Sequence, residues 1–179
     1  MSQRIWRDWK GFIAFISVMV VFRSAVADWN QVPSGSMLPS ILIGDRVIVD
    51  KLAYDLRIPL TMTRLAQWDD PKRSDIVTFE SPLDDRLLIK RIIGIPGDTV
   101  KLENNRLVIN GVTAEYKKLP KQSLRADLQI PYSHTEIFLE NILGEERQVM
   151  LFRKPRKATA SSFQAVTLIK GQYLMLGDN

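Results

Sequence analysis

The sequence predicts an all-β domain of antiparallel sheets behind one N-terminal transmembrane helix. Three observations lead to this fold class: an apolar run at residues 11–22, the loss of helical periodicity after that run, and short β-branched segments of strand length through the rest of the chain. The length of 179 residues suits one globular domain with an appendage. The hydrophobic fraction of 45% and charged fraction of 25% exclude global disorder.

The N-terminal segment has two interpretations. Residues 1–10 are basic, an apolar run follows, Arg23 interrupts it, and Ala25-Val26-Ala27 comes next. A cleaved signal peptide has this basic start and an apolar run of about 7–15 residues before an Ala-x-Ala exit, and the pattern alone slightly favours it. A membrane anchor needs about 17–25 residues, which 11–27 provides if the Arg23 side chain extends to the far interface. In both cases the positive charge stays inside, so the chain beyond Asp28 lies outside the cytoplasm.

Strands are expected at several apolar or alternating segments of the body. Alternation over 98–103 and 107–109, with a turn at Asn104-Asn105 and the strong hairpin signal Asn110-Gly111, predicts a meander whose third strand is 112–116. The other expected strands are 47–49, 75–79, 87–93, 166–169 and 173–176. Residues 119–163 are polar and are expected to form a less regular insertion, in which only 137–139 and 149–152 resemble strands.

The composition excludes several kinds of chemistry. The chain has no cysteine, which excludes a disulfide scaffold, a thiolate nucleophile, a cysteine-based zinc site and an iron–sulfur cluster. The one histidine, His134, leaves almost no room for a Ser-His-Asp triad. The basic run 147–157 lacks an aromatic platform and a recognition helix, so a solvated face or a surface near anionic lipid is favoured over a nucleic-acid site. No metal or cofactor is expected.

A candidate nucleophile lies in the segment Gln31–Ser40. Its two prolines stiffen the chain, and Gly35 lets the backbone approach a ligand closely. Ser36 can present its hydroxyl as a nucleophile, while the Ser36 N–H and the Ser34 hydroxyl can donate to an oxyanion. Taken alone, the segment is more often a plain Ser/Gly/Pro turn.

A serine nucleophile needs a base, and lysine is the remaining candidate. Burial disfavours the charged amine and lowers its pKa, so the base is sought in an apolar strand. Lys90 lies in the one such segment, 87–93, where it shares a face with Leu88 and Ile92 while Arg91 faces the other way. An edge-strand lysine is the ordinary alternative. Together the two segments favour a catalytic pair over a plain turn and an ordinary strand lysine, because one supplies a nucleophile and the other a base.

These segments resemble the conserved boxes of bacterial type I signal peptidases. Four boxes occur in family order behind the N-terminal segment: Pro33-Ser-Gly-Ser-Met-Leu-Pro-Ser40 with Gly44-Asp45 and Asp50-Lys-Leu-Ala-Tyr54, then Arg73–Phe79, then Ile89-Lys-Arg-Ile-Ile-Gly-Ile-Pro-Gly-Asp98, and then Gly177-Asp178-Asn179. Ser74 stands where the family usually has glycine. Four ordered boxes are a specific signal, and the similarity covers about residues 12–179.

The resemblance implies a membrane-anchored serine endopeptidase that removes signal peptides from exported proteins. Ser36 would be the acylating nucleophile, Lys90 the general base, and the Ser34 hydroxyl with the Ser36 N–H the oxyanion hole. Arg91 and Asp178 would support the site. The apolar residues at substrate-pocket positions are Val32, Pro33, Met37, Ile41, Leu88 and Ile89. Asn30 stands where an apolar residue is common.

The implied substrates and location follow from the same resemblance. The substrates are preproteins with Ala-x-Ala-type signal peptides, bound as an extended strand. The location is the bacterial plasma membrane, crossed once. Residues 1–10 would be cytoplasmic, 11–27 the anchor, and 28–179 the peptidase domain on the outer or periplasmic side. Lipid is then a partner and nucleic acid is not. The anchor is now favoured over cleavage after Ala27.

One departure from the family leaves rival functions open. Family members continue after Gly-Asp-Asn with Arg-Asp-Asn-Ser-x-Asp-Ser-Arg, whereas this sequence stops at Asn179. Either the sequence is a fragment or the protein is crippled, and a non-catalytic membrane-tethered β-domain is then the rival from another class. A pilin-type or conjugation peptidase, or a self-cleaving repressor relative, would use the same chemistry. The apolar anchor and the lack of a DNA-binding helix pair argue against the repressor.

Overall fold

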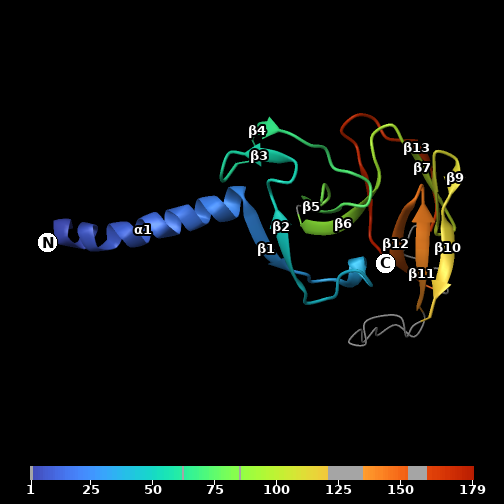
Figure 1. Cartoon of the computed structure of the whole chain (residues 1–179), viewed down its shortest axis with the longest axis horizontal. Helices are drawn as coiled ribbons and strands as arrows, with labels where there is room; N and C mark the ends of the chain where they lie inside the picture. The colour runs from blue at the N-terminus through green and yellow to red at the C-terminus, as the bar shows by residue number, and fades with distance from the viewer. Residues whose placement is uncertain (1, 62, 85, 121–134, 153–160) are drawn as a thin grey trace. The chain divides into compact units, whose positions relative to one another are not determined.

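The computed structural model describes residues 2–61, 63–84, 86–120, 135–152 and 161–179. The chain forms two compact units. The first unit holds the chain up to residue 31 together with 46–70, and the second holds 32–45 and 71–179. Strands dominate the described residues (Figure 1), and their pairings are antiparallel, as the sequence predicts.

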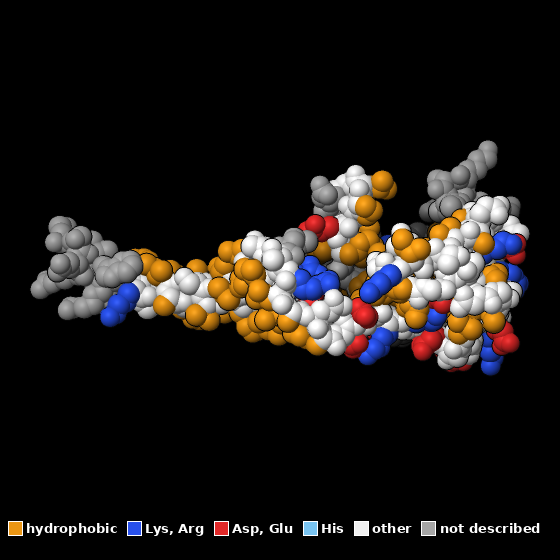
Figure 2. Space-filling model, turned by 90° about the horizontal axis from the view of Figure 1, so that it is seen from above, with side chains coloured by type: hydrophobic (Ala, Val, Ile, Leu, Met, Phe, Trp, Pro, Cys, Tyr) orange, Lys and Arg blue, Asp and Glu red, His pale blue; other side chains and the backbone are white. Residues whose placement is uncertain are grey.

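The first unit contains the helix α1 and two short β-ribbons. Its elements are α1 (Ser2–Ala25), β1 (Ala27–Gln31), β2 (Arg46–Asp50), β3 (Asp55–Arg57) and β4 (Arg64–Gln67), and β1 pairs with β2 while β3 pairs with β4. Many apolar side chains lie on the part of α1 that Figure 2 draws in colour, and large apolar residues from Trp9 to Phe22 are exposed. Among the described helices, none combines the length and the apolar character needed to cross a membrane.

Polar contacts hold the C-terminal end of α1. The Lys51 amine donates to the carbonyls of Arg23 and Ser24 at 2.9 and 3.3 Å, which satisfies carbonyls that the last helical turn leaves unpaired. The Arg23 guanidinium pairs with Asp28 at 2.7 Å. The apolar helix therefore ends in a cluster of charged groups at the start of β1.

The second unit is built from three sheets. Its strands are β5 (Ile76–Glu80), β6 (Leu87–Gly94), β7 (Thr99–Glu103), β8 (Arg106–Ile109), β9 (Val112–Thr113), β10 (Glu115–Leu119), β11 (Thr135–Ile142), β12 (Glu145–Phe152), β13 (Phe163–Thr167) and β14 (Leu174–Leu176). The strand orders are β14-β6-β5, β13-β7-β8-β9 and β10-β11-β12. Apolar side chains between the sheets form the main core, made of Ile93, Val100, Leu107, Ile109, Ala114, Ile142 and Leu168.

The predicted meander exists, but its third strand is divided. Asn110 and Gly111 have φ of 52° and 81°, the positive values that a two-residue hairpin turn of this kind requires. After β9 the chain leaves the sheet at Ala114, which is buried in the core, and continues as β10 in a different sheet. The prediction of one continuous strand over 112–116 is therefore wrong, because a small buried residue lets the chain cross between two sheets.

The third sheet lies within the polar stretch 119–163 and the strand before it. β11 and β12 pair along their full length, from Thr135 opposite Phe152 to Ile142 opposite Glu145. Both strands extend well beyond the short apolar segments 137–139 and 149–152 that the sequence indicated. Ile137 and Met150 of this sheet form a second small core with Leu38, which lies next to the site described below.

Candidate active site

The candidate nucleophile lies on a one-turn 3₁₀ helix, η1 (Gly35–Met37). Ser34 precedes it with an extended backbone (φ −140°, ψ 156°), and its hydroxyl does not cap the turn. Met37 and Leu38 are buried at 1% and 4% exposure, so they anchor the turn in the protein interior. Ser36 remains partly exposed. Among the described residues the Ser36 hydroxyl has no hydrogen-bond partner.

The last residues of the chain hold this turn by its backbone. The Asn179 N–H donates to the Ser36 carbonyl at 3.2 Å, and the Asn179 side-chain amide donates to the Gly35 carbonyl at 3.0 Å. Gly177 lies so close that a Cβ there would be 2.3 Å from the Ser36 carbonyl oxygen. The carbonyls of the turn are therefore occupied by these contacts.

Lys90 lies on the neighbouring strand β6, and η1 packs against this strand. β6 pairs with β5 and β14, with Lys90 opposite Val77. Burial lowers the pKa of the Lys90 amine, and attraction by the Asp178 carboxylate partly offsets that effect. Its amine makes no ion pair or hydrogen bond with the residues that the structure describes. Such an amine releases its proton more readily than a surface lysine.

Arg91, the next residue of β6, is held instead by Asp178. Two guanidinium nitrogens donate to the two Asp178 carboxylate oxygens at 3.0 and 2.8 Å, and a third contact at 3.0 Å goes to the Ser74 carbonyl. The Asp178 side chain is fully buried and also accepts from the Ser40 hydroxyl at 2.6 Å. Asp178 thus connects the strand of Lys90 to the segment that carries Ser36.

The residues expected at a substrate pocket occupy different environments. Val32 and Met37 are buried at 3% and 1% exposure, and Pro33 is exposed. The remaining three, Ile41, Leu88 and Ile89, are partly buried. All six belong to the same unit as Ser36 and Lys90.

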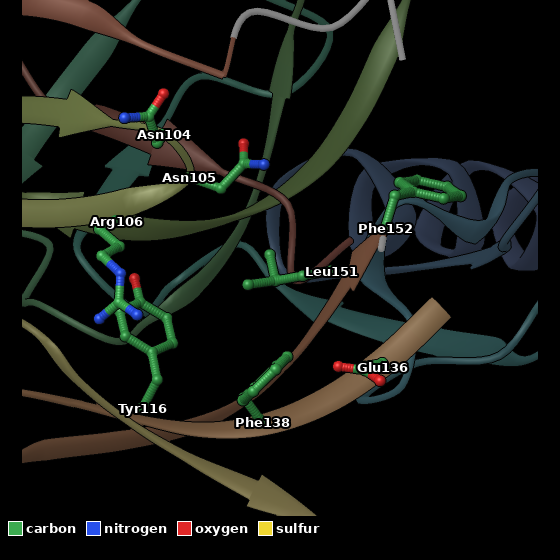
Figure 3. A pocket seen from close by; sticks show the side chains of 8 residues that line it. All are labelled: Asn104, Asn105, Arg106, Tyr116, Glu136, Phe138, Leu151 and Phe152. Carbon is green, nitrogen blue, oxygen red and sulfur yellow. The ribbon is translucent and has the colours of Figure 1, made fainter. Parts of the chain in front are cut away.

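A cavity of about 230 Å³ occurs elsewhere in this unit (Figure 3). It lies between the β7–β8 turn and the sheet β10-β11-β12, and none of the candidate catalytic residues lines it. Its lining residues are Asn104, Asn105, Arg106, Tyr116, Glu136, Phe138, Leu151 and Phe152. Among the described residues, no group of three or more acidic or histidine side chains could hold a metal ion. His134 is outside the described residues.

Sequence reasoning missed two residues near the site, Ser40 and Arg147. The sequence places Arg147 at the start of a basic run expected to be a solvated face, but its side chain is only 7% exposed and forms ion pairs with Glu140 and Asp178. The expectation is wrong for Arg147, because it shares a face of β12 with the buried Val149 and two carboxylates meet its charge. The part of the run at 153–157 is outside the described residues. Glu140, an acidic residue within an apolar strand segment, was the available signal that a buried cation would lie nearby.

Comparisons with a family model and with individual known proteins indicate the same family. Residues 6–179 match the family model described as signal peptidase, peptidase S26. The chain is 30% identical over 172 residues to signal peptidase I of Pseudomonas aeruginosa, and equally to that of Pseudomonas fluorescens, covering 95% of this chain. It is also 35% identical over 111 residues to a probable thylakoidal processing peptidase 2 of Arabidopsis thaliana, covering 58% of this chain and 27% of that protein. The chain spans 58% of the length of the two Pseudomonas relatives.

Proposed function

The chain belongs to the signal peptidase family, peptidase S26, and we propose that it is a serine endopeptidase that removes N-terminal signal peptides from exported preproteins. One observation carries the proposal: the turn of the partly exposed Ser36 packs against the strand that carries a lysine with a lowered pKa. A hydroxyl beside an amine that is easily deprotonated can act as a nucleophile with a base.

The proposed reaction begins with the neutral Lys90 amine. It takes the proton of the Ser36 hydroxyl as Oγ attacks the scissile carbonyl carbon, and the carbonyl oxygen becomes an oxyanion. The Ser36 N–H and the Ser34 hydroxyl donate hydrogen bonds to that oxygen. When the tetrahedral intermediate collapses, the Lys90 ammonium returns the proton to the leaving amine. Water then attacks the acyl-enzyme with Lys90 again acting as the base, which regenerates the Ser36 hydroxyl.

The proposed substrates are preproteins whose signal peptides end in Ala-x-Ala. The apolar residues around the turn and on β6 favour small side chains next to the scissile bond. The peptide would lie as an extended strand, so that backbone hydrogen bonds hold signal peptides of many sequences.

The proposed location is the outer face of the bacterial plasma membrane. The exposed apolar surface of α1 supports contact of that helix with lipid, and its basic N-terminal end favours the cytoplasmic side. The Arg23–Asp28 pair and Lys51 would then lie at the outer interface, where charged groups remain hydrated. On this proposal α1 is a single-pass anchor.

The experiment is cleavage of a purified preprotein with an Ala-x-Ala exit by the protein in detergent. Ser36→Ala should abolish cleavage while the fold survives, and Ser34→Ala should cost about 10²–10³-fold, since it removes one of two oxyanion donors. Lys90→Arg should be inactive although the charge is kept, because a guanidinium does not release its proton in proteins. The wild-type rate should rise with pH as Lys90 loses its proton.

Ser36→Ala cleaving within tenfold of wild type would refute the nucleophile. A near-normal rate for Lys90→Arg would leave Lys90 as a lysine of the central strand β6 without a catalytic role. Circular dichroism of each variant checks that a lost rate does not come from a lost fold.

A further inference from the structure

The sheet β10-β11-β12 packs against the segments that form the candidate site. Leu38, directly after the Ser36 turn, forms a small buried core with Ile137 of β11 and Met150 of β12. The Met150 N–H also donates to the Asp178 carbonyl at 2.7 Å. The sheet therefore contacts both the segment of the nucleophile and the segment that holds it.

A chain of buried polar groups runs from this sheet to the site. The Tyr116 hydroxyl donates to Glu140 at 2.6 Å, and the Arg147 guanidinium donates to Glu140 at 2.5 Å and to Asp178 at 3.3 Å. The side chains of Arg147, Glu140 and Asp178 are 7%, 3% and 0% exposed. Charges this deeply buried need partners, so the positions of these groups depend on one another.

We propose that Arg147 is a positioning residue of the candidate active site. It holds Asp178, and through Asp178 it keeps Gly177–Asn179 on the Ser36 turn and sets the electric field at the Lys90 amine. This inference rests on the proposed function, in which Lys90 is the base. It gives the sheet β10-β11-β12 a role in the reaction, although its residues do not touch the reacting atoms.

The charged groups around Lys90 determine the sign of the effect. β5 carries only Glu80, opposite Leu87 at the end of the strand pair, while η1 and β14 are uncharged and β14 leads into Asp178. Asp178 is balanced by Arg91 on β6 and by Arg147 on β12, which also faces Glu140. Loss of the Arg147 charge removes part of the positive charge that balances the Asp178 carboxylate. The carboxylate then stabilises the protonated form of the Lys90 amine more strongly, so the pKa of Lys90 rises.

The test measures the Lys90 pKa directly, in the full chain. Competitive acetylation of the amines with a trace of acetic anhydride across pH, followed by mass spectrometry of the Lys90 peptide, needs no catalysis. Arg147→Met should raise the Lys90 pKa by about one unit and move the rise of the cleavage rate to higher pH by the same amount. Arg147→Lys keeps the charge and should restore most of both values.

Glu140→Gln supplies the opposite sign. It removes the other carboxylate that faces Arg147, so more of the Arg147 charge acts on Asp178 and the Lys90 pKa should fall. The double variant Arg147→Met/Glu140→Gln removes both charges and should return close to wild type, which makes the set a double-mutant cycle. Lys118→Met is the matched control, since it removes an exposed cation of the same sheet, paired with Glu136 at 2.7 Å, and should change neither value.

A folded Arg147→Met protein decides the matter: a Lys90 pKa within about 0.2 units of wild type overturns the proposal. If that variant does not fold, Glu140→Gln decides it, and the absence of a downward shift in the Lys90 pKa overturns the proposal.

The proposed function and the proposed role of Arg147 can fail separately. If neither wild type nor variants cleave preprotein, the proposed function is wrong, but the Lys90 pKa still tests Arg147. If Ser36→Ala cleaves normally, the nucleophile is wrong and the labelling result stands.

Discussion

Two buried aspartates of the same unit, Asp98 and Asp178, pair with arginines, and only Asp178 adjoins the candidate catalytic residues. Arg73 pairs with Asp98 at 2.9 Å, and Asp98 also accepts from the Ile95 N–H and the Asn110 amide at 2.8 and 2.9 Å. These contacts close the turn between β6 and β7 and tie it to the hairpin that follows. Ile95 belongs to this turn and Asn110 to the hairpin, and Arg73 lies 25 residues before Asp98 in sequence.

Asp178 collects its partners from more distant parts of the chain. Ser40, Arg91 and Arg147 lie 138, 87 and 31 residues from it in sequence. The Asp98 pair therefore serves the stability of one turn, whereas the Asp178 pair fixes the relative positions of the nucleophile turn, the lysine strand and the sheet β10-β11-β12. The same kind of arginine–aspartate contact therefore stabilises a turn in one place and supports the candidate site in the other, and the partners of each aspartate show which role it has.

The largest difference is expected between Asp178→Ala and Asp98→Ala. Each change leaves a buried arginine without its carboxylate, so both should lower the free energy of unfolding by about 3–5 kcal/mol. Only Asp178→Ala should also lower kcat/KM, by about 10²-fold or more, because the Ser36 turn loses its support. Urea denaturation and preprotein cleavage, both at a temperature where the variants are folded, provide the two numbers. Equal losses of rate would remove the distinction between the pairs.

Two glycines sharpen the same comparison. A Cβ at Gly177 would lie 2.3 Å from the backbone carbonyl of Ser36, whereas one at Gly94 would meet the side-chain ends of Leu168 and Val100 at 2.6 and 2.8 Å. Gly177→Ala should therefore displace the turn and cost about 10²-fold in kcat. Gly94→Ala should cost about 1–3 kcal/mol of stability and leave the rate of the folded protein nearly unchanged. The same rate for both would show that the turn tolerates movement.

The pH dependence of stability isolates the Asp98 pair. Burial raises the pKa of Asp98, but hydrogen bonds from Ile95 and Asn110 and the contact with Arg73 outweigh it, and the pKa lies below its ordinary value. The folded state therefore gains stability from the ionised carboxylate above the unfolded pKa of about 4, and loses it as pH falls through the lower folded value. The difference in unfolding free energy between wild type and Asp98→Asn should shrink as pH falls below about 4. A difference that is constant from pH 2 to pH 7 would contradict this, as a set of urea titrations can show.

The smallest effect is expected at His134. The sequence places it in the polar stretch before β11, and the proposed chemistry gives it no part. His134→Ala should therefore leave the pH profile of cleavage unchanged, and its rate should remain within about twofold of wild type. Loss of a titration near neutral pH would indicate a histidine-dependent reaction instead.

Local patterns were sufficient for several strands and for the turns. β2, β5, β6, β7 and β8 lie where short apolar or alternating segments predicted them, because period and turn residues act over a few positions. β1 and the β3–β4 ribbon were missed, since polar strands such as Ala27–Gln31 form only by pairing with a partner. Val112–Tyr116 was predicted as one strand because nothing in five residues shows that two sheets meet at Ala114.

The sequence by itself determined the identity of the candidate residues. A stiff Pro-Ser-Gly-Ser-Met segment and a lysine in an apolar strand indicated Ser36 and Lys90, since both signals depend on residue types at neighbouring positions. Only the tertiary structure decided what surrounds them. Burial of Arg147 and its contact with Asp178, 31 residues away, depend on how a three-stranded sheet packs against the site, and a basic residue in a polar stretch looks the same in sequence whether it meets water or a buried carboxylate.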